Sequence, residues 1–487
     1  MQAEAQPWNF EMFVGGKWVP SHTGRTYAVL NPAAGQVMAQ AQRGDYEDVR
    51  AAVETAKSAF ENPTWRSLDP SRRGRTLFKI AQLLRDRLSD FAKLETLNNG
   101  KPLGQAKGDV AASARHFEYF AGMADKIQGA TIPVPGNRLD YTVREPVGVT
   151  AHIVPWNYPL VMAARSIAPA LAAGNSVVAK PASFTPLTLL KFAELCKEAG
   201  LPDGVLNVVT GGGQEMGEAL VRHPDVRLVV VTGSVETGVR VMELASANLS
   251  KVVLELGGKN PNIVFGDANP EKAVQGVLNG IYTNAGQMCW AGSRLLVESS
   301  VADKMVGAVV EGAKSMRLGS GMDPDTKMGP LVAESQRDRV ASYVDGSVGE
   351  GARILAGGRP PGTAALSAGF FYEPTVLGDV TQGMKVAKEE IFGPVLTVST
   401  FETDADAVKL ANDVDYGLWA GVWTRDIRRA HGVAARLEAG IVSINEEPVT
   451  FPQTPFGGFK RSGNSSEQGM DAISSYVRVK NVMVNLD

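Results

Sequence analysis

Lys251-Val252-Val253-Leu254-Glu255-Leu256-Gly257-Gly258 is the stretch that decides the fold, because an apolar strand here runs into a double-glycine turn. Four earlier segments are apolar throughout and alternate with helical patterns: Val149 to Val154, Ser176 to Ala179, Val205 to Val209 and Leu228 to Val231. Strands that are apolar on both faces and separated by helices indicate a parallel sheet covered on both sides. The sequence therefore predicts a doubly wound α/β domain, which would bind its ligand beyond the carboxyl ends of the strands.

Helical spacing of apolar residues fills the gaps between these strands. Helices are predicted near Val161 to Ala172, Leu187 to Ala199, Met216 to Val221 and Val235 to Ala247, with further packing helices between Asp45 and Asn98. A glycine pair within Phe13 to Val19 predicts a hairpin near the amino terminus. The first domain is thus predicted to be a sheet with helices on both faces.

A second alternating region follows Gly258. Its predicted elements are a helix over Pro270 to Tyr282, a strand over Leu295 to Glu298, a helix over Val301 to Ser315 and a buried strand over Gly440 to Asn445. We interpret this region as a second α/β lobe that meets the first near Glu255. An inter-domain cleft of this kind is a favoured place for a small-molecule site.

Two segments, Leu139 to Arg144 and Ser475 to Val484, alternate apolar and charged residues as two-sided strands do. Such strands could pair with each other or with another subunit.

The bulk composition excludes several classes of partner. The 487 residues carry 49 basic and 52 acidic side chains, a net charge of −3, which gives no electrostatic reason to expect nucleic acid or a membrane surface. No secretory signal or membrane-spanning apolar run is visible, and the two cysteines suggest a reducing compartment, so the cytoplasm is expected. The five histidines are scattered and predict no metal site.

Cys289 and Glu255 are the candidate reactive pair. Cys289 lies in a glycine-bearing loop, Asn284 to Trp290, whereas Cys196 falls on the apolar face of a predicted helix and is expected to be core. A thiol and a carboxylate on neighbouring loops supply a nucleophile and a base for covalent catalysis on a carbonyl. The alternative is an inert buried cysteine and a solvated glutamate.

The loops after the parallel strands carry polar groups that fall on one sheet edge. Asn157 could aim its amide at an oxygen that gains negative charge, or could cap the helix that opens at Pro159. Gly233 and Ser234 stand where a helix begins, a place suited to phosphate, although a simple turn explains them equally. Lys180 could meet a ribose or phosphate or be a solvated loop end.

Seven runs, spread in order over nearly the whole chain, resemble the aldehyde dehydrogenase superfamily: Pro155-Trp156-Asn157-Tyr158-Pro159, Lys180-Pro181, Thr232-Gly233-Ser234, Glu255-Leu256-Gly257-Gly258-Lys259, Gly286-Gln287-Met288-Cys289, Glu389 to Val395 and Pro455-Phe456-Gly457-Gly458. The resemblance implies oxidation of an aldehyde to the acid with a nicotinamide cofactor. It also implies a Rossmann-like cofactor domain (1–124 and 146–254), an α/β catalytic domain (255–452), and a small β oligomerisation arm (125–145) with a C-terminal strand (470–487).

The resemblance also implies roles for individual residues. Cys289 would attack the carbonyl, Asn157 would hold the oxyanion, Glu255 would activate water, and Glu467 would assist proton transfer. The residues implied to contact the cofactor are Trp156, Lys180, Ser183, Gly211, Gly213, Gly233, Ser234, Glu390 and Phe392. Those implied to line the substrate tunnel are Tyr158, Arg165, Met288, Trp290, Thr450 and Phe456.

Two positions depart from, or refine, the family pattern. Ser183 stands where many NAD-using relatives carry glutamate, so NADP is expected to be tolerated and even preferred. Arg165 could pair with a substrate carboxylate, which would favour a semialdehyde, or with an internal acid such as Glu446 or Glu447. An aromatic aldehyde would suit the mixed aromatic walls.

Three rival interpretations remain open: a CoA-acylating relative, a cysteine hydrolase, and a catalytically silent structural protein on the same scaffold. Retention of Glu255 argues against the first, and the absence of a histidine near Cys289 in sequence argues against the second. The presence of Cys289, Glu255 and Asn157 together argues against the third. Analogy with relatives also predicts a homodimer or homotetramer.

Overall fold

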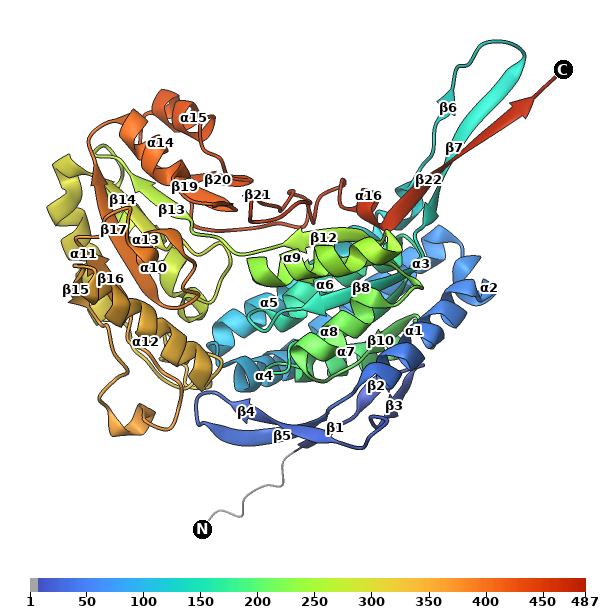
Figure 1. The fold of residues 1–487 in the computed structure, drawn as a ribbon, viewed down its shortest axis with the longest axis horizontal. Coiled ribbons are helices and arrows are strands. Elements are labelled where there is room, and N and C mark those ends of the chain that lie inside the picture. Colours follow the sequence, from blue (N-terminus) through green and yellow to red (C-terminus); the bar gives the residue numbers. More distant parts are fainter. Residues whose placement is uncertain (1–7) are drawn as a thin grey trace.

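Two seven-stranded sheets form the framework of the structure, a computed structural model that describes residues 8–487. The sheets lie side by side with helices around them, and a β ribbon projects from one end (Figure 1). The predicted α/β class with two lobes and a β arm is confirmed.

The first sheet has the strand order β12-β11-β8-β9-β10-β2-β3. Its five parallel strands confirm the five predicted segments: β8 (Val149–Val154), β9 (Ser176–Pro181), β10 (Leu206–Val208), β11 (Val226–Thr232) and β12 (Lys251–Glu255). Both faces are buried, since Val177 belongs to one core cluster and its neighbour Val178 to another. Alternate side chains of a strand point to opposite faces, which is why these strands are apolar throughout.

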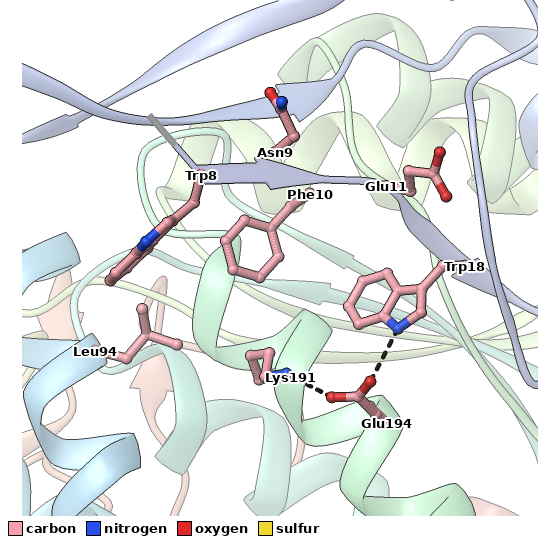
Figure 2. Close-up of a pocket in the computed structure, with 8 residues that line it drawn as sticks. All are labelled: Trp8, Asn9, Phe10, Glu11, Trp18, Leu94, Lys191 and Glu194. Atoms are coloured by element: carbon pink, nitrogen blue, oxygen red, sulfur yellow. Dashed lines mark hydrogen bonds and ion pairs between the residues drawn. The ribbon is translucent and has the colours of Figure 1, made fainter. Parts of the chain in front are cut away.

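The predicted amino-terminal hairpin extends this sheet. Strands β2 (Met12–Val14) and β3 (Lys17–Val19) pair antiparallel, and Gly15 and Gly16 have φ of 61° and 73°, as a two-residue hairpin turn requires. Strand β1 (Trp8–Phe10) pairs with β5 (Gln36–Gln42), which in turn pairs with β4 (Thr26–Asn31). Figure 2 shows the rings of Trp8, Phe10 and Trp18 above Leu94, Lys191 and Glu194, where the Trp18 indole donates to Glu194 at 3.0 Å.

Helices cover both faces of the first sheet, as predicted. They are α1 (Tyr46–Glu61), α3 (Pro70–Asp86), α4 (Leu88–Asn99), α5 (Leu103–Ala121), α6 (Pro159–Ala172), α7 (Leu187–Glu198), α8 (Gly213–Arg222) and α9 (Val235–Ala245). Cys196 on α7 is fully buried in the core, which confirms its predicted structural role.

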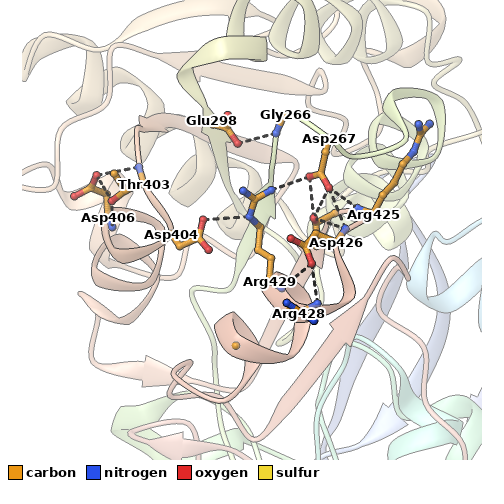
Figure 3. A network of polar contacts seen from close by, with 12 residues as sticks. Gly266, Asp267, Glu298, Thr403, Asp404, Asp406, Arg425, Asp426, Arg428 and Arg429 are labelled. Atoms are coloured by element: carbon orange, nitrogen blue, oxygen red, sulfur yellow. Dashed lines mark hydrogen bonds and ion pairs between the residues drawn. The ribbon is translucent and has the colours of Figure 1, made fainter.

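The second sheet has the order β15-β16-β17-β14-β13-β19-β20. Its strands are β13 (Pro261–Val264), β14 (Arg294–Glu298), β15 (Arg353–Ala356), β16 (Thr375–Gly378), β17 (Val395–Phe401), β19 (Trp419–Trp423) and β20 (Ile441–Ile444). Its main helices are α10 (Pro270–Tyr282), α11 (Ala302–Lys314), α12 (Glu334–Gly349), α14 (Asp404–Asn412) and α15 (Ile427–Ala434). Asp267, just after β13, accepts hydrogen bonds from Thr424 and from the backbone of Arg425 and so fixes the start of α15 (Figure 3).

The projecting ribbon consists of β7 (Arg138–Pro146) and β22 (Val477–Asn485), with the short β6 (Thr131–Ile132) beside β7. Strands β7 and β22 pair antiparallel from Val477 opposite Pro146 to Asn485 opposite Arg138. The two alternating segments of the sequence therefore pair with each other, one of the two predicted arrangements. Within residues 8–487, none of the helices is long and apolar enough to cross a bilayer.

Candidate active site

A cavity of about 350 Å³ opens where the two lobes meet. The first lobe contributes loops that follow β8, β11 and β12, so the carboxyl ends of parallel strands do form the site, as predicted. The lining residues are Pro155, Trp156, Asn157, Thr232, Gly233, Ser234, Glu236 and Gly257 from the first lobe and its last turn, and Cys289, Gln336, Arg339, Glu390 and Phe392 from the second.

Cys289 is placed by a tight turn after α10. Asn284 and Ala285 adopt left-handed conformations with φ of 50° and 54°. Gly286 has φ of 72°, and a Cβ there would lie 2.1 Å from the carbonyl oxygen of Gly393, so only glycine fits. The turn leaves Cys289 partly exposed on the cavity wall. Burial raises the pKa of its thiol to about 12, while Arg165 acts in the opposite direction.

Asn157 is fixed on both its side chain and its backbone. The side-chain nitrogen donates to the carbonyl of Gln287 at 3.0 Å, in the loop that carries Cys289. The Asn157 carbonyl accepts from Lys101 at 3.0 Å and from the Asn284 side chain at 2.9 Å. An amide nitrogen carries two N–H groups, so Asn157 can hold the cysteine loop with one and donate to an oxyanion with the other.

Glu255 ends β12 and is only 1% exposed. Neither carboxylate oxygen has a hydrogen-bond partner among the residues that the structure describes. Burial, followed by the nearby Glu467, raises the pKa of Glu255 well above its usual range, and Arg165 offsets only part of this. A desolvated carboxyl group of raised pKa is suited to accept a proton near neutral pH.

Residues 453–469 bring the chain back to Glu255 at the end of β12. Glu467 exchanges two backbone hydrogen bonds of 2.7 Å with Phe456, and Gly463 forms a bridge to Glu255. Glu467 is 3% exposed and forms an ion pair with Arg165. The sequence division left residues 453–469 outside the three parts of the chain, although Phe456 and Glu467 of this segment were among the expected site residues.

Arg165 has an internal partner, but not the one proposed from sequence. Its Nε contacts Glu467, whereas Glu447 accepts a hydrogen bond from Asn279 at 2.7 Å. The expectation that Glu446 or Glu447 pairs with Arg165 was therefore wrong. The physical reason is the return of residues 453–469 across the cleft, which brings a carboxylate closer than the loop after β20 does.

The predicted cofactor residues divide into two groups. Five of them line the cavity: Trp156, Gly233, Ser234, Glu390 and Phe392. Trp156 and Phe392 pack edge to face at 5.1 Å, and Ser234 caps α9 by accepting from the Thr237 amide at 3.2 Å. Glu390 accepts from the Gly258 amide at 3.0 Å, and burial raises its pKa to about 7.

The other four, Lys180, Ser183, Gly211 and Gly213, do not line this cavity. Lys180 is buried at the end of β9 and donates to the carbonyl of Pro181 at 3.2 Å, and burial lowers its pKa to about 8. Ser183 follows in the same loop, and Gly213 begins α8. These residues still lie at the carboxyl edge of the first sheet, because Lys180 is in register with Ile153 of β8.

The predicted substrate-wall residues are placed by packing contacts. Trp290 and Phe456 pack edge to face at 5.2 Å, and the Tyr158 ring lies 3.8 Å from the Lys101 ammonium. Met288 is buried within the core of the second lobe, and Thr450 lies 2.7 Å from the Gln468 side-chain amide. The walls therefore combine aromatic rings from both lobes.

Sequence reasoning missed four residues of the site: Glu236, Gln336, Arg339 and Lys101. Gln336 and Arg339 on α12 donate to the carbonyls of Phe392 at 2.8 Å and Glu390 at 3.1 Å. Lys101 is buried, and its Nζ forms an ion pair with the Asp109 carboxylate oxygen Oδ2 at 2.5 Å. An Asn-Gly-Lys-Pro turn that places a lysine between two helices is the one sequence signal that could have identified Lys101.

The cavity is lined by a helix amino terminus bearing Ser234, by the Trp156–Phe392 pair and by the half-buried Glu390. These features fit a dinucleotide. The site therefore defines a nucleotide-dependent α/β enzyme with a cysteine nucleophile. The sequence profile of the aldehyde dehydrogenase family matches residues 18–482, and the chain belongs to this family. It is an oxidoreductase that oxidises an aldehyde to the carboxylic acid with a nicotinamide cofactor through a cysteine.

Similar proteins span the full chain. Betaine aldehyde dehydrogenase from Bacillus subtilis is 44% identical over 97% of this chain and 97% of its own, and aldehyde dehydrogenase 1A1 from Homo sapiens is 44% identical over 98% and 95%. A crystal structure of betaine aldehyde dehydrogenase from Staphylococcus aureus in complex with NAD+ has a TM-score of 0.97 and 42% identity, covering 98% of this chain and 95% of that one.

Proposed function

We propose that Cys289, Asn157 and Glu255 carry the reaction. The Cys289 sulfur would add to the aldehyde carbon, and the resulting oxyanion would be held by the Asn157 amide and the Cys289 backbone N–H. The nicotinamide, when bound, accepts the hydride from that carbon and leaves a thioester on Cys289. Glu255 would then remove a proton from water, the water oxygen would attack the thioester carbon, and the carbon–sulfur bond would break to release the acid.

The observation that carries this proposal is the convergence of the three groups from distant segments. The Asn157 side chain donates to the loop that holds Cys289 at 3.0 Å, and the turn after Glu255 meets the same loop, since the Asn260 side chain donates to the Cys289 carbonyl at 2.9 Å. Retention of a buried, partner-free carboxyl favours water over coenzyme A as the acceptor of the acyl group. Glu467 is assigned the transfer of the proton away from Glu255.

We assign the cofactor site to Trp156, Lys180, Ser183, Gly211, Gly213, Gly233, Ser234, Glu390 and Phe392. Solved relatives from Staphylococcus aureus and Bacillus cereus bind NAD+. Ser183 leaves space for a 2′-phosphate and does not repel it, so this chain should accept both NAD and NADP. Initial rates with equal saturating concentrations of each cofactor test this, and a complete lack of NADP-linked activity would refute it.

The substrate is proposed to be an apolar or aromatic aldehyde. Tyr158, Met288, Trp290, Thr450 and Phe456 would form its walls, and the Trp290–Phe456 contact supplies a rigid aromatic surface. Arg165 stands behind these walls and already has a carboxylate partner.

We further propose the division into a cofactor domain (1–124 and 146–254), a catalytic domain (255–452) and an arm with its C-terminal strand (125–145 and 470–487). The arm exposes Val479 and Met483, at 60% and 57%, which suits pairing with another subunit in a homodimer or homotetramer. Light scattering of the full chain would determine the state. The proposed location is the cytoplasm.

A panel of aliphatic, aromatic and semialdehyde substrates tests the proposed function, with absorbance of the reduced cofactor as the readout. Cys289→Ala should abolish turnover, while Cys196→Ala, the matched control in the core, should retain it. Full turnover by folded Cys289→Ala would overturn the assignment.

A further inference from the structure

Arg165 is a cation buried between three segments of the chain. It projects from α6, is 2% exposed, and contacts the Glu467 carboxylate through Nε. Its guanidinium carbon lies 4.4 Å from the centre of the Phe456 ring, and Nη2 lies 3.5 Å from the Thr232 hydroxyl. Such a set of contacts fixes the guanidinium in one place.

These contacts put the charge directly behind the catalytic cavity. Thr232 lines the same cavity as Cys289. Phe456 packs against Trp290, the residue that follows Cys289, at 5.2 Å. The Phe456 ring therefore lies between the Arg165 guanidinium and the residue next to Cys289, although no basic residue lies next to Cys289 in sequence.

The electrostatics of the site agree with this placement. Burial, Glu390 and Glu255 raise the pKa of the Cys289 thiol, and the charge of Arg165 lowers it. Burial alone would lower the pKa of Arg165, but Glu467, Glu255 and Cys289 raise it above its usual value, so the cation persists. The titratable groups that face the sulfur or the guanidinium are Arg165, Glu255, Glu390, Tyr158, Glu467, Tyr476 and His116.

We propose that Arg165 is the resident cation of the catalytic centre: Glu467 holds it as a counter-ion, and it favours the Cys289 thiolate instead of binding a substrate carboxylate. The inference rests on one part of the proposed function, namely that Cys289 is the nucleophile. A substrate carboxylate would compete with Glu467 for one guanidinium and add negative charge beside Glu255. Arg165 is thus a positioning residue whose guanidinium is already occupied by Glu467 and is not free to bind an anionic aldehyde.

The first test is the rate of iodoacetamide alkylation of Cys289 against pH, without cofactor, in the full chain. Arg165→Met should move the midpoint upward by about one pH unit, so the rate below the midpoint falls about tenfold, whereas Arg165→Lys should stay near wild type. Arg115→Met is the matched control, because Arg115 is 44% exposed and pairs with Glu118 on the surface of α5. The alkylation rate of Cys289→Ala, in which only Cys196 can react, is subtracted from each profile.

A second variant keeps the inference falsifiable if Arg165→Met does not fold. Glu467→Gln removes the counter-ion and leaves the cation unneutralised, so the alkylation midpoint should move downward. An unchanged profile in folded Arg165→Met, or an upward shift in Glu467→Gln, would overturn the inference.

The second test compares kcat/KM for succinic semialdehyde and butanal. Wild type should prefer butanal. In Arg165→Lys and Arg165→Met, the kcat/KM for the semialdehyde divided by that for butanal should fall less than twofold. A tenfold loss confined to the semialdehyde would show that Arg165 binds substrate. If wild type oxidises no aldehyde, the proposed function fails, yet the pH shift of alkylation still decides the role of Arg165.

Discussion

Glu255→Gln should separate the two halves of the reaction. Glu255 is almost fully buried and its pKa is raised well above the usual range, so its protonated form is close in shape and charge to glutamine. The substitution should therefore leave the fold and cofactor binding intact. It removes the group that takes a proton from water, and a positioned general base contributes about 10²- to 10⁴-fold.

That factor corresponds to about 2.7–5.4 kcal/mol of activation free energy. Hydride transfer precedes the hydrolysis that this substitution slows. Rapid mixing should therefore show a burst of about one equivalent of reduced cofactor per active site, as covalent catalysis predicts. Steady turnover should then be slower than wild type by the factor above. Glu334→Gln, on the exposed start of α12, is the matched control and should behave as wild type.

The pH dependence gives an independent check. A carboxyl group of raised pKa gains its basic form only above the usual titration range of a glutamate, so wild-type kcat should increase with pH above that range wherever deacylation limits the rate. Glu255→Gln should lose this dependence. A steady rate near wild type without a burst, in folded Glu255→Gln, would refute the assignment of Glu255 as the base.

Three further predictions concern the thiol, the cofactor and the support of Asn157. Oxidised cofactor should move the alkylation profile of Cys289 to lower pH, since the nicotinamide is positively charged; identical profiles would exclude the cofactor as an activator. Ser183→Glu should lower the ratio of NADP- to NAD-linked kcat/KM at least tenfold, about 1.4 kcal/mol, and an unchanged ratio would contradict the role of Ser183. Lys101→Met, which breaks the buried pair with Asp109, should cost about 3–5 kcal/mol in thermal denaturation, while Lys101→Met combined with Asp109→Leu should cost less. Equal losses would show that the unpaired charge of Asp109 is not the source of the cost.

The first lobe could be predicted from sequence because its strands are apolar on both faces. The prediction for β8 matches Val149–Val154, and those for β9 and β11 differ from the structure only at their ends. In the second lobe, only β14 and β20 were predicted individually, because strands such as β16 and β17 lie within longer loops that obscure their periodicity. The arm was predictable as two strands, but their register depends on pairing that no local pattern specifies.

The reactive groups were also predictable, since Cys289 lies in a glycine-bearing loop outside any helical period and Glu255 ends a strand that runs into a double-glycine turn. Their electrostatic neighbours were not. Arg165 meets Glu467 because residues 453–469 return across the cleft, and Lys101 meets Asn157 because the start of α5 packs beside the loop after β8. No periodicity or spacing encodes such contacts, and the sequence accordingly pointed to the wrong partners for Arg165.

The segment 453–469 links substrate selection to catalysis. The Leu256 amide donates to the carbonyl of Ser462 at 2.8 Å, so the segment is bonded to the residue next to Glu255. The same segment carries Phe456, a residue of the proposed substrate wall, and Glu467, which contacts the guanidinium of Arg165. A change in this segment should therefore alter the position of the wall and the charge around Glu255 together, because interiors transmit small displacements. Substitutions here that change only KM are consequently not expected.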